Sequence, residues 1–328
     1  MTIARRRLLA ALGGAAAAWA LAARAQLALP VLGFLSGQSP EGFAQLAAAF
    51  RQGLKETGFV DGDNVSIDYR WAENQLDRLP ALAADLVRRR VTVMTASGGH
   101  TAVFAAKAAT ATIPIVFLAG EDPVKLGLVE SLARPGGNLT GINFFSAELV
   151  AKRLELLHEL MPTATRIAAL VNPSNPVSEP TVRDLQTAAQ VMGLQIQILN
   201  ASSSREIEAA FGDLARERPG ALYVPIEPLF TARRVHLAQL AARHAIPAVY
   251  GARDYVEVGG LISYGTSLTD GYRQLGIYAG RVLKGSKPSE LPVLQSSKFE
   301  LVINAATARM LDLTVPPTLI ARADEVIE

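Results

Sequence analysis

From residue 29 onward the chain alternates short β-branched runs with amphipathic stretches of helical length. Runs typical of buried strands are "PVLGFLS" (30–36), "VTVMTAS" (91–97) and "IPIVFLA" (113–119). Between them, stretches such as 40–58 carry apolar residues at helical spacing and end at a glycine. Strands and helices that alternate through short connections form parallel βαβ units. The sequence therefore predicts an α/β fold with doubly wound parallel sheets.

The same pattern begins afresh in the second half of the chain. A helix is predicted over 147–162, followed by strands at 166–172, 194–200, 221–226 and 246–251. Two runs of one unit predict two similar lobes: lobe 1 from 27–143 plus 266–294, and lobe 2 from 144–265 plus 295–328. Several strands then cross between the lobes as a hinge. In the first half, "DPVKLGLVESLARPGGN" (122–138) predicts a short helix and a turn.

The N-terminus has the layout of an export signal. Three arginines, Arg5 to Arg7, precede an apolar run over 8–23, and Ala23-Arg24-Ala25 fits a small-x-small cleavage site. We expect a signal peptide over residues 1–25, cleaved after Ala25, and a periplasmic product. An uncleaved anchor is disfavoured because the run is shorter than a span of about 20 residues. The general and twin-arginine export routes both stay open.

Charge and cysteine content exclude several classes of function. The chain has 32 Lys and Arg, four of them in the first 25 residues, which leaves 28 against 30 Asp and Glu, about −2. That balance gives no electrostatic reason to bind nucleic acid. Cysteine is absent, which excludes disulfides, zinc–thiolate sites and lipid attachment to cysteine. No metal or cofactor is expected, because the four histidines show no ligand spacing.

Candidate ligand contacts follow the predicted strands, because ligands of open parallel sheets bind beyond the carboxyl ends of the strands. Three loops in each half converge there. The candidates in the first half are Ser36, Gly37, Ser39, Ser97, Gly98, Gly99, His100, Thr101 and Glu121. Those in the second half are Asn175, Glu227, Phe230, Tyr250 and Asp254.

The stretch 97–101, "SGGHT", is the most informative of these loops. Its two adjacent glycines do not match the dinucleotide-binding motif GxGxxG, and the GK[ST] sequence of a phosphate-binding P-loop does not follow. The stretch is therefore not a nucleotide-binding loop. A strand end, two glycines and a helix start suit a carboxylate instead, because helix N-termini favour negative charge. Ser36 and Ser39 would assist. Glu227 and Asp254 are candidates for a ligand ammonium group, and Phe230 and Tyr250 for its apolar part.

Several long segments resemble one bacterial family. They include "RWAENQLDRLPALAADLV", "DPVKLGLVESLARPGGNLTGINFFSAELVAKRLELL" and "GGLISYGTSLTDGYRQLGIYAGRVLKG". They are similar to the periplasmic substrate-binding proteins of ABC transporters, in the group with tryptophan- and tyrosine-binding members. The resemblance, from about residue 29 to 328, implies two Rossmann-like lobes of the type I periplasmic-binding fold joined by three crossings. It also implies a membrane permease and an ATPase as partners, and no catalytic residue.

Two departures from that family bear on the ligand. Members that bind aromatic amino acids carry an Asp-Asn type motif where this chain has Ile226-Glu227-Pro228, and a Thr-Gly-Thr-Pro-like loop at 97–100. We therefore expect a monomeric solute-binding protein for a small carboxylate-bearing ligand, an amino acid or derivative. The alternative is a periplasmic hydrolase or isomerase using His100 with Glu121 or Asp122. A sensor that reports to a membrane receptor is also open.

Overall fold

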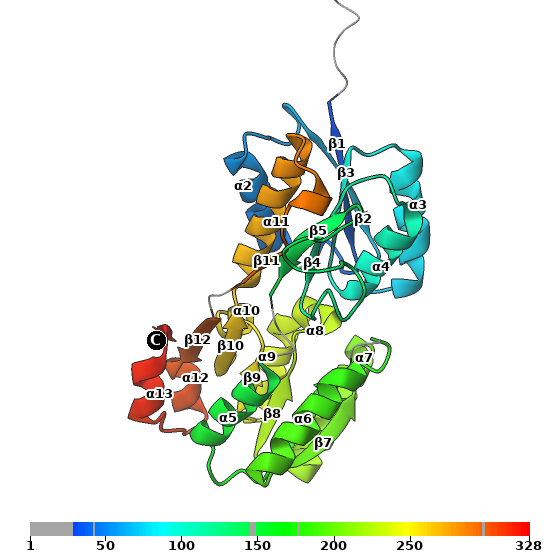
Figure 1. The fold of residues 1–328 in the computed structure, drawn as a ribbon. Helices are drawn as coiled ribbons and strands as arrows, with labels where there is room; N and C mark the ends of the chain where they lie inside the picture. The colour runs from blue at the N-terminus through cyan, green and yellow to red at the C-terminus, as the bar shows by residue number, and fades with distance from the viewer. Residues whose placement is uncertain (1–28, 42, 145–148, 176–177, 297–298) are drawn as a thin grey trace, which may run out of the picture.

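The structure is a computed structural model that describes residues 29–328 apart from 42, 145–148, 176–177 and 297–298. The predicted export signal, residues 1–25, lies outside the described residues. Two α/β lobes are stacked end to end, each around its own sheet (Figure 1). Among the described residues, no helix combines the length and the apolar character needed to cross a bilayer.

The first sheet is entirely parallel, with the order β11-β5-β4-β3-β1-β2. Its strands are β1 (Val31–Ser36), β2 (Ser66–Trp71), β3 (Val93–Ser97), β4 (Ile115–Ala119), β5 (Leu139–Asn143) and β11 (Leu294–Gln295). Its helices are α2 (Ala44–Glu56), η1 (Leu76–Arg78), α3 (Leu79–Arg88), α4 (His100–Ala109), α11 (Leu268–Leu283) and η2 (Pro288–Glu290). Helices α2 and α11 pack together on one face, and α3 and α4 on the other (Figure 1).

The second sheet has the order β13-β12-β10-β9-β8-β6-β7, with only the β10–β12 pair antiparallel. Its strands are β6 (Arg166–Val171), β7 (Gln195–Asn200), β8 (Ala221–Val224), β9 (Ala248–Tyr250), β10 (Ile262–Thr266), β12 (Phe299–Asn304) and β13 (Glu325–Ile327). Its helices are α5 (Val150–Leu160), α6 (Ser178–Met192), α7 (Ser204–Glu217), α8 (Pro228–Ala232), α9 (Arg234–Arg243), α10 (Arg253–Val256), α12 (Ala305–Met310) and α13 (Pro317–Arg322). Helices α8 and α10 lie at the junction with the first lobe (Figure 1).

The predicted α/β fold with two parallel-sheet lobes is confirmed. The chain passes between the sheets after β5, after β10 and after β11. These passes lie side by side, because Asn143 pairs with Gln295 and Thr266 with Phe299. The Thr266 hydroxyl also donates to the backbone oxygen of Phe144 at 2.9 Å. The hinge is therefore a narrow band of neighbouring segments.

The helix predicted within 122–138 is wrong, since these residues form turns. Asp122 starts one turn by accepting hydrogen bonds from the N–H groups of Val124 at 2.8 Å and Lys125 at 3.3 Å. Gly127 has a φ of 65°, which ends any helical path after that turn. The segment then runs through Pro135 and two glycines with positive φ into β5.

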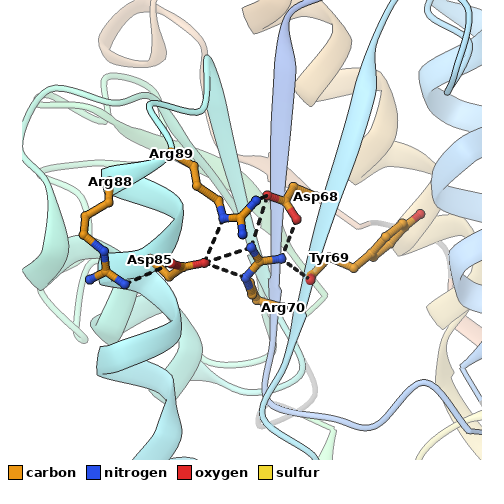
Figure 2. A network of polar contacts seen from close by, with 6 residues as sticks. All are labelled: Asp68, Tyr69, Arg70, Asp85, Arg88 and Arg89. Carbon is orange, nitrogen blue, oxygen red and sulfur yellow. Dashed lines mark hydrogen bonds and ion pairs between the residues drawn. The ribbon is translucent and has the colours of Figure 1, made fainter.

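A charged network fixes the edge strand of the first sheet (Figure 2). Arg70 on β2 donates from Nε and Nη2 to Asp85 on α3, at 2.9 and 2.8 Å, and also pairs with Asp68 on its own strand. Arg88 and Arg89 add contacts to Asp85 from the last turn of α3 and beyond it. The Arg70 guanidinium, more than the other two, holds the pKa of Asp85 below its usual range.

Candidate functional site

A cavity between the two lobes lies at the carboxyl ends of the first sheet's strands; we call it the interlobe cavity. It comprises about 580 Å³ of space outside the protein atoms, part of it open to solvent. The first lobe lines it with Gln38, Leu46, Gly98, Gly99, His100, Leu118, Ala119, Gly120, Glu121, Phe144, Leu268 and Tyr272. The second lobe lines it with Asn175, Ile226, Pro228 and Thr231.

The start of α4 forms one wall. Gly98 and Gly99 have φ values of 71° and 108°, a left-handed region that side chains rarely adopt. A Cβ on Gly98 would lie 2.7 Å from the Ser36 Oγ, so the loops after β1 and β3 need this glycine to pack closely. Among the described residues, no acceptor is recorded for the backbone N–H groups of Gly99, His100 and Thr101. These groups at a helix start favour an anion.

His100 is a neutral imidazole in this wall. It is 4% exposed, and burial lowers its pKa from 6.5 to about 4. Its Nδ1 lies 3.8 Å from a Glu121 carboxylate oxygen, and its ring meets Phe104 edge-on with centroids 5.9 Å apart. Its Nε2 is buried with no hydrogen-bond partner among the described residues. At neutral pH the contact with Glu121 is therefore not a charged pair.

Tyr272 of α11 also lines the first-lobe side of the cavity, beside Ser97 and Gly98 at the end of β3. Burial raises the pKa of its hydroxyl, and contacts with Ser97 and the backbone of Gly98 oppose that rise. The Asp254 carboxylate of the second lobe also acts to raise the Tyr272 pKa. Asp254 is 4% exposed, its Oδ2 has no hydrogen-bond partner among the described residues, and burial raises its pKa.

Glu227 organises the second-lobe wall. Its Oε1 accepts hydrogen bonds from the side-chain amides of Asn172 at 2.9 Å and Asn175 at 3.4 Å. Its Oε2 accepts from the Phe230 N–H at 3.1 Å, which caps α8. Burial raises the pKa of Glu227, and these donors oppose the rise. One buried carboxylate thus joins the loop after β6 to the helix that carries Thr231.

Five of the residues predicted from the sequence line the interlobe cavity. They are Gly98, Gly99, His100, Glu121 and Asn175. Four others lie next to it on the first-lobe side: Ser36, Gly37 and Ser97 behind Gly98, and Thr101 one residue further into α4. Ser39 lines a smaller hollow nearby that shares Leu46 and Thr231 with the cavity. The Asp122 carboxylate accepts a hydrogen bond from the Val124 N–H within the turn that follows β4.

The predicted second-lobe residues lie mostly behind the wall. Phe230 and Tyr250 are fully buried in the apolar core, and Tyr250 stacks on Tyr255 with ring centroids 4.8 Å apart. Glu227 borders two other cavities, while Asp254 is buried in α10. None of these four is among the residues that line the interlobe cavity.

Sequence reasoning missed several lining residues. Gln38 stands within the loop 36–39, which the strand-end rule singled out, and Thr231 directly follows the loop 226–230. Tyr272 and Leu268 come from α11; the sequence assigns this segment to lobe 1, but the strand-end rule singles out no residue on it. Of the residues that the structure describes, no Lys or Arg lines the cavity. In the part of the chain that the structure describes, no group of three His, Asp or Glu side chains is placed to hold a metal ion.

Comparison with known proteins identifies relatives over nearly the whole length. The family model for "ABC transporter substrate binding protein" matches residues 30–327. A tyrosine-binding protein from Clostridioides difficile is 31% identical over 268 residues, which cover 80% of this chain and 75% of that protein.

Solved structures show the same fold. An ABC domain in complex with L-Trp from Streptococcus pneumoniae superposes with a TM-score of 0.81 at 27% identity, over 92% of this chain and 100% of that one. The ligand-free, open structure of a substrate-binding protein with adhesive properties from Clostridium difficile gives 0.64 at 26% identity, over 92% and 99%. The two-lobed architecture is thus the type I periplasmic-binding fold. The chain belongs to the ABC transporter substrate-binding protein family, which is non-catalytic and acts outside the cytoplasm.

Proposed function

We propose that this protein captures a small molecule bearing both a carboxylate and an amine, an amino acid or a derivative, in the interlobe cavity. The observation that carries the proposal is the composition of the cavity: among the described residues, an uncapped helix start, one carboxylate and no cationic side chain line it. The relatives support an amino acid, because one is described as tyrosine-binding and another is in complex with L-Trp.

The ligand carboxylate binds at the start of α4 in this proposal. Backbone N–H groups of Gly99, His100 and Thr101 supply the donors, and the helix dipole adds about 0.3–1 kcal/mol for an anion. The side-chain amide of Gln38 and the Tyr272 hydroxyl border the same space. Ser36, Gly37, Ser39 and Ser97 hold the loop behind these donors. Neutral His100 accepts or donates one hydrogen bond without adding charge.

The ligand amine binds toward the carboxylates of the site. Glu121 lines the cavity, and the buried Asp254 carboxylate acts electrostatically on Tyr272, which lines the cavity as well. Glu227 does not contact the ligand in this proposal, but its hydrogen bonds hold Asn175 and α8 in place. Apolar side chains, Leu46, Leu118, Phe144, Ile226 and Leu268, receive the rest of the ligand. Phe230 and Tyr250 support that wall from the core.

Closure of the lobes over the ligand then presents one surface to a membrane permease, which an ATPase partner drives. In this proposal the protein acts as a monomer in the periplasm after cleavage of residues 1–25. Membership of a non-catalytic family removes the hydrolase or isomerase alternative for His100 with Glu121 or Asp122.

Calorimetry tests the proposal directly. Purified protein is unfolded and refolded to remove carried ligand, then titrated with the common L-amino acids, their decarboxylated amines and their deaminated acids. We expect at least one amino acid to bind at least tenfold tighter than both of its truncated counterparts, because each end has its own partners.

Variants locate the binding. We expect His100→Ala to weaken that ligand about tenfold or more, whereas His236→Ala on the surface of α9 leaves affinity unchanged. His236 is a matched control because its imidazole pairs with Glu208 at 2.8 Å, outside the interlobe cavity. Binding of amines alone, or equal loss in both variants, would contradict the proposal.

A further inference from the structure

The interlobe cavity leaves little free volume in this arrangement of the lobes. Of its space outside the protein atoms, about 60 Å³ is open to the centre of a water molecule. One water needs about 10–15 Å³ on this measure, so the cavity has room for about four to six waters. An engineered apolar cavity that binds benzene has about 150 Å³. The interlobe cavity is therefore too small to enclose an aromatic side chain together with the carboxylate and amine of an amino acid.

The second-lobe wall of this cavity is supported from behind at Ile226. A Cβ on Gly251 would lie 2.4 Å from the Ile226 Cγ1 and 3.0 Å from the Ile226 backbone nitrogen. The backbone of Gly251 therefore lies directly against Ile226 and keeps its side chain from retreating in that direction. Two residues further along, the Pro228 Cγ lies 3.2 Å from the position that a Cβ on Gly99 would take. Because the two lobes touch at this point, a larger ligand must move them apart to gain volume.

The first-lobe wall is supported in the same way. Leu118 of β4 is 4% exposed, and a Cβ on Gly271 of α11 would lie 3.4 Å from the Leu118 Cδ1. Gln38 packs on the turn before α4, because a Cβ on Gly98 would lie 3.1 Å from the Gln38 Cγ. Both side chains line the cavity, and both pack against a glycine of a neighbouring segment. Packed walls on both lobes therefore set the free volume.

We propose that the interlobe cavity selects a small amino acid, with a side chain of no more than about two non-hydrogen atoms, and that Ile226 and Leu118 set this limit. The inference rests on the proposed function and names its substrate class: glycine, alanine, serine or a derivative of similar size. The carboxylate, the amine and the carbon that joins them already fill most of the free volume. This chain would then differ in ligand size from the relatives described as tyrosine-binding and as an L-Trp complex.

Calorimetry measures the limit with ligands that differ only in the side chain. Glycine, alanine, serine, valine, phenylalanine, tyrosine and tryptophan form a series of increasing size. We expect alanine or serine to bind at least tenfold tighter than each of the three aromatic members, because a ring forces the lobes apart. A preference smaller than tenfold, or a preference for an aromatic member, would overturn the inference.

A variant of the second-lobe wall locates the limit. Ile226→Ala enlarges the cavity, so the affinity for valine divided by the affinity for alanine should rise at least fivefold. A ratio measured within one variant does not depend on how much of that protein is folded. The matched control is Ile198→Ala, because Ile198 is also half-buried but lies on β7 and is not among the residues that line the cavity. The control should leave the ratio unchanged, and equal ratios in the two variants would overturn the inference.

The outcomes separate this inference from the proposed function. If Ile226→Ala fails to fold by circular dichroism, Leu118→Ala takes its place with the same expected rise in the ratio. Tight binding of aromatic amino acids overturns only the size limit, because it still shows capture of an amino acid. Failure of every amino acid in the series to bind overturns both proposals.

Discussion

Glu227 shows how one side chain shapes a site without lining it. Its two oxygens accept from three donors, so the residue must supply acceptors only. Removing an acceptor would leave buried donors unsatisfied, at about 1–3 kcal/mol for each group. Asn175 and α8, both part of the interlobe wall, would then lose their common anchor.

We expect Glu227→Gln to lower the free energy of unfolding by about 2 kcal/mol, because the new amide group turns a donor toward other donors. Urea denaturation measures this loss. Glu208→Gln is the control, since its carboxylate is about half exposed and pairs only with His236 at the surface. That variant should stay within about 1 kcal/mol of the original chain. Equal losses in the two variants would show that Glu227 has no organising role.

The buried imidazole of His100 should make stability depend on pH. Its pKa is about 4 in the folded protein, below the unfolded value of 6.5, so the unfolded chain binds more protons between these two values. The contribution of His100 to stability is therefore fully present above pH 6.5 and is lost as pH falls toward 4. The total loss is up to about 3 kcal/mol.

Urea unfolding of the original chain and of His100→Gln checks this expectation at pH 7.0, 5.5 and 4.5. The difference in unfolding free energy between the two proteins should shift steadily in favour of the variant as pH falls. A difference that stays constant across these pH values would mean that His100 titrates normally in the folded protein.

The predicted residues that line the interlobe cavity from the first lobe are those that directly follow a strand. Gly98, Gly99 and His100 follow β3 and Glu121 follows β4, while β1 ends level with β3, with Ser36 paired to Ser97. Tyr272 could not be found in this way because it lies on α11, and only tertiary packing brings it beside Ser97 and Gly98. Tyr250 also follows the strand-end rule, but its ring turns into the core to stack on Tyr255.

At the scale of elements, α2 and α11 pack so closely that their backbones are in contact. A Cβ on Gly53 of α2 would lie 1.8 Å from the backbone oxygen of Arg273 on α11. From the other side, a Cβ on Gly276 would lie 2.1 Å from the backbone oxygen of Phe50. Both helices therefore need glycine to bring their backbones together, as Figure 1 shows for their parallel courses.

We expect Gly53→Ala to lower the unfolding free energy by at least about 2 kcal/mol, since the added methyl group meets rigid backbone. Gly212→Ala on α7 should instead raise it by about 0.5–1 kcal/mol, because nothing lies within 4 Å of the new Cβ and alanine favours helix. Thermal or urea unfolding of both variants measures the contrast. A stabilising Gly53→Ala would mean that the two helices can separate at little cost.

The sequence predicted most strands to within two residues, because buried β-branched runs leave few alternatives. The sequence predicted helices less well where a turn or a glycine with positive φ interrupts the helical pattern. The helix expected in 122–138 is replaced by turns at Gly127, and the stretch 231–244 is divided between α8 and α9. Strand β13 and helix α13 near the C-terminus were not anticipated, since their segments are too short to show a period.

At the scale of the whole molecule, the arrangement of the lobes resembles a liganded relative more than an open one. The TM-score is 0.81 against the L-Trp complex and 0.64 against the ligand-free, open structure, at nearly equal identity and equal coverage of this chain. Within one fold, such a difference reflects the relative placement of the two lobes. Gly99 fits a closed arrangement, because its Cβ position lies 3.2 Å from Pro228 of the second lobe.

We expect the ligand-free protein in solution to be more open than this structure and to contract when ligand binds. Small-angle X-ray scattering with and without the amino acid found by calorimetry measures the change. The liganded curve should fit this structure, and the unliganded curve should show a larger radius of gyration. Identical curves in the two states would contradict closure.

The interleaving of the chain between the two sheets has a consequence for the order of folding during synthesis. The first sheet is completed by β11, and α11 covers one face of its strands β3, β4 and β5, yet both β11 and α11 follow the strands β6 to β10 of the second sheet. A nascent chain therefore carries an apolar sheet face around Val93, Val116 and Leu118 that α11 cannot cover until most of the polypeptide has been made. Chaperones that hold incomplete chains would find their binding surface there.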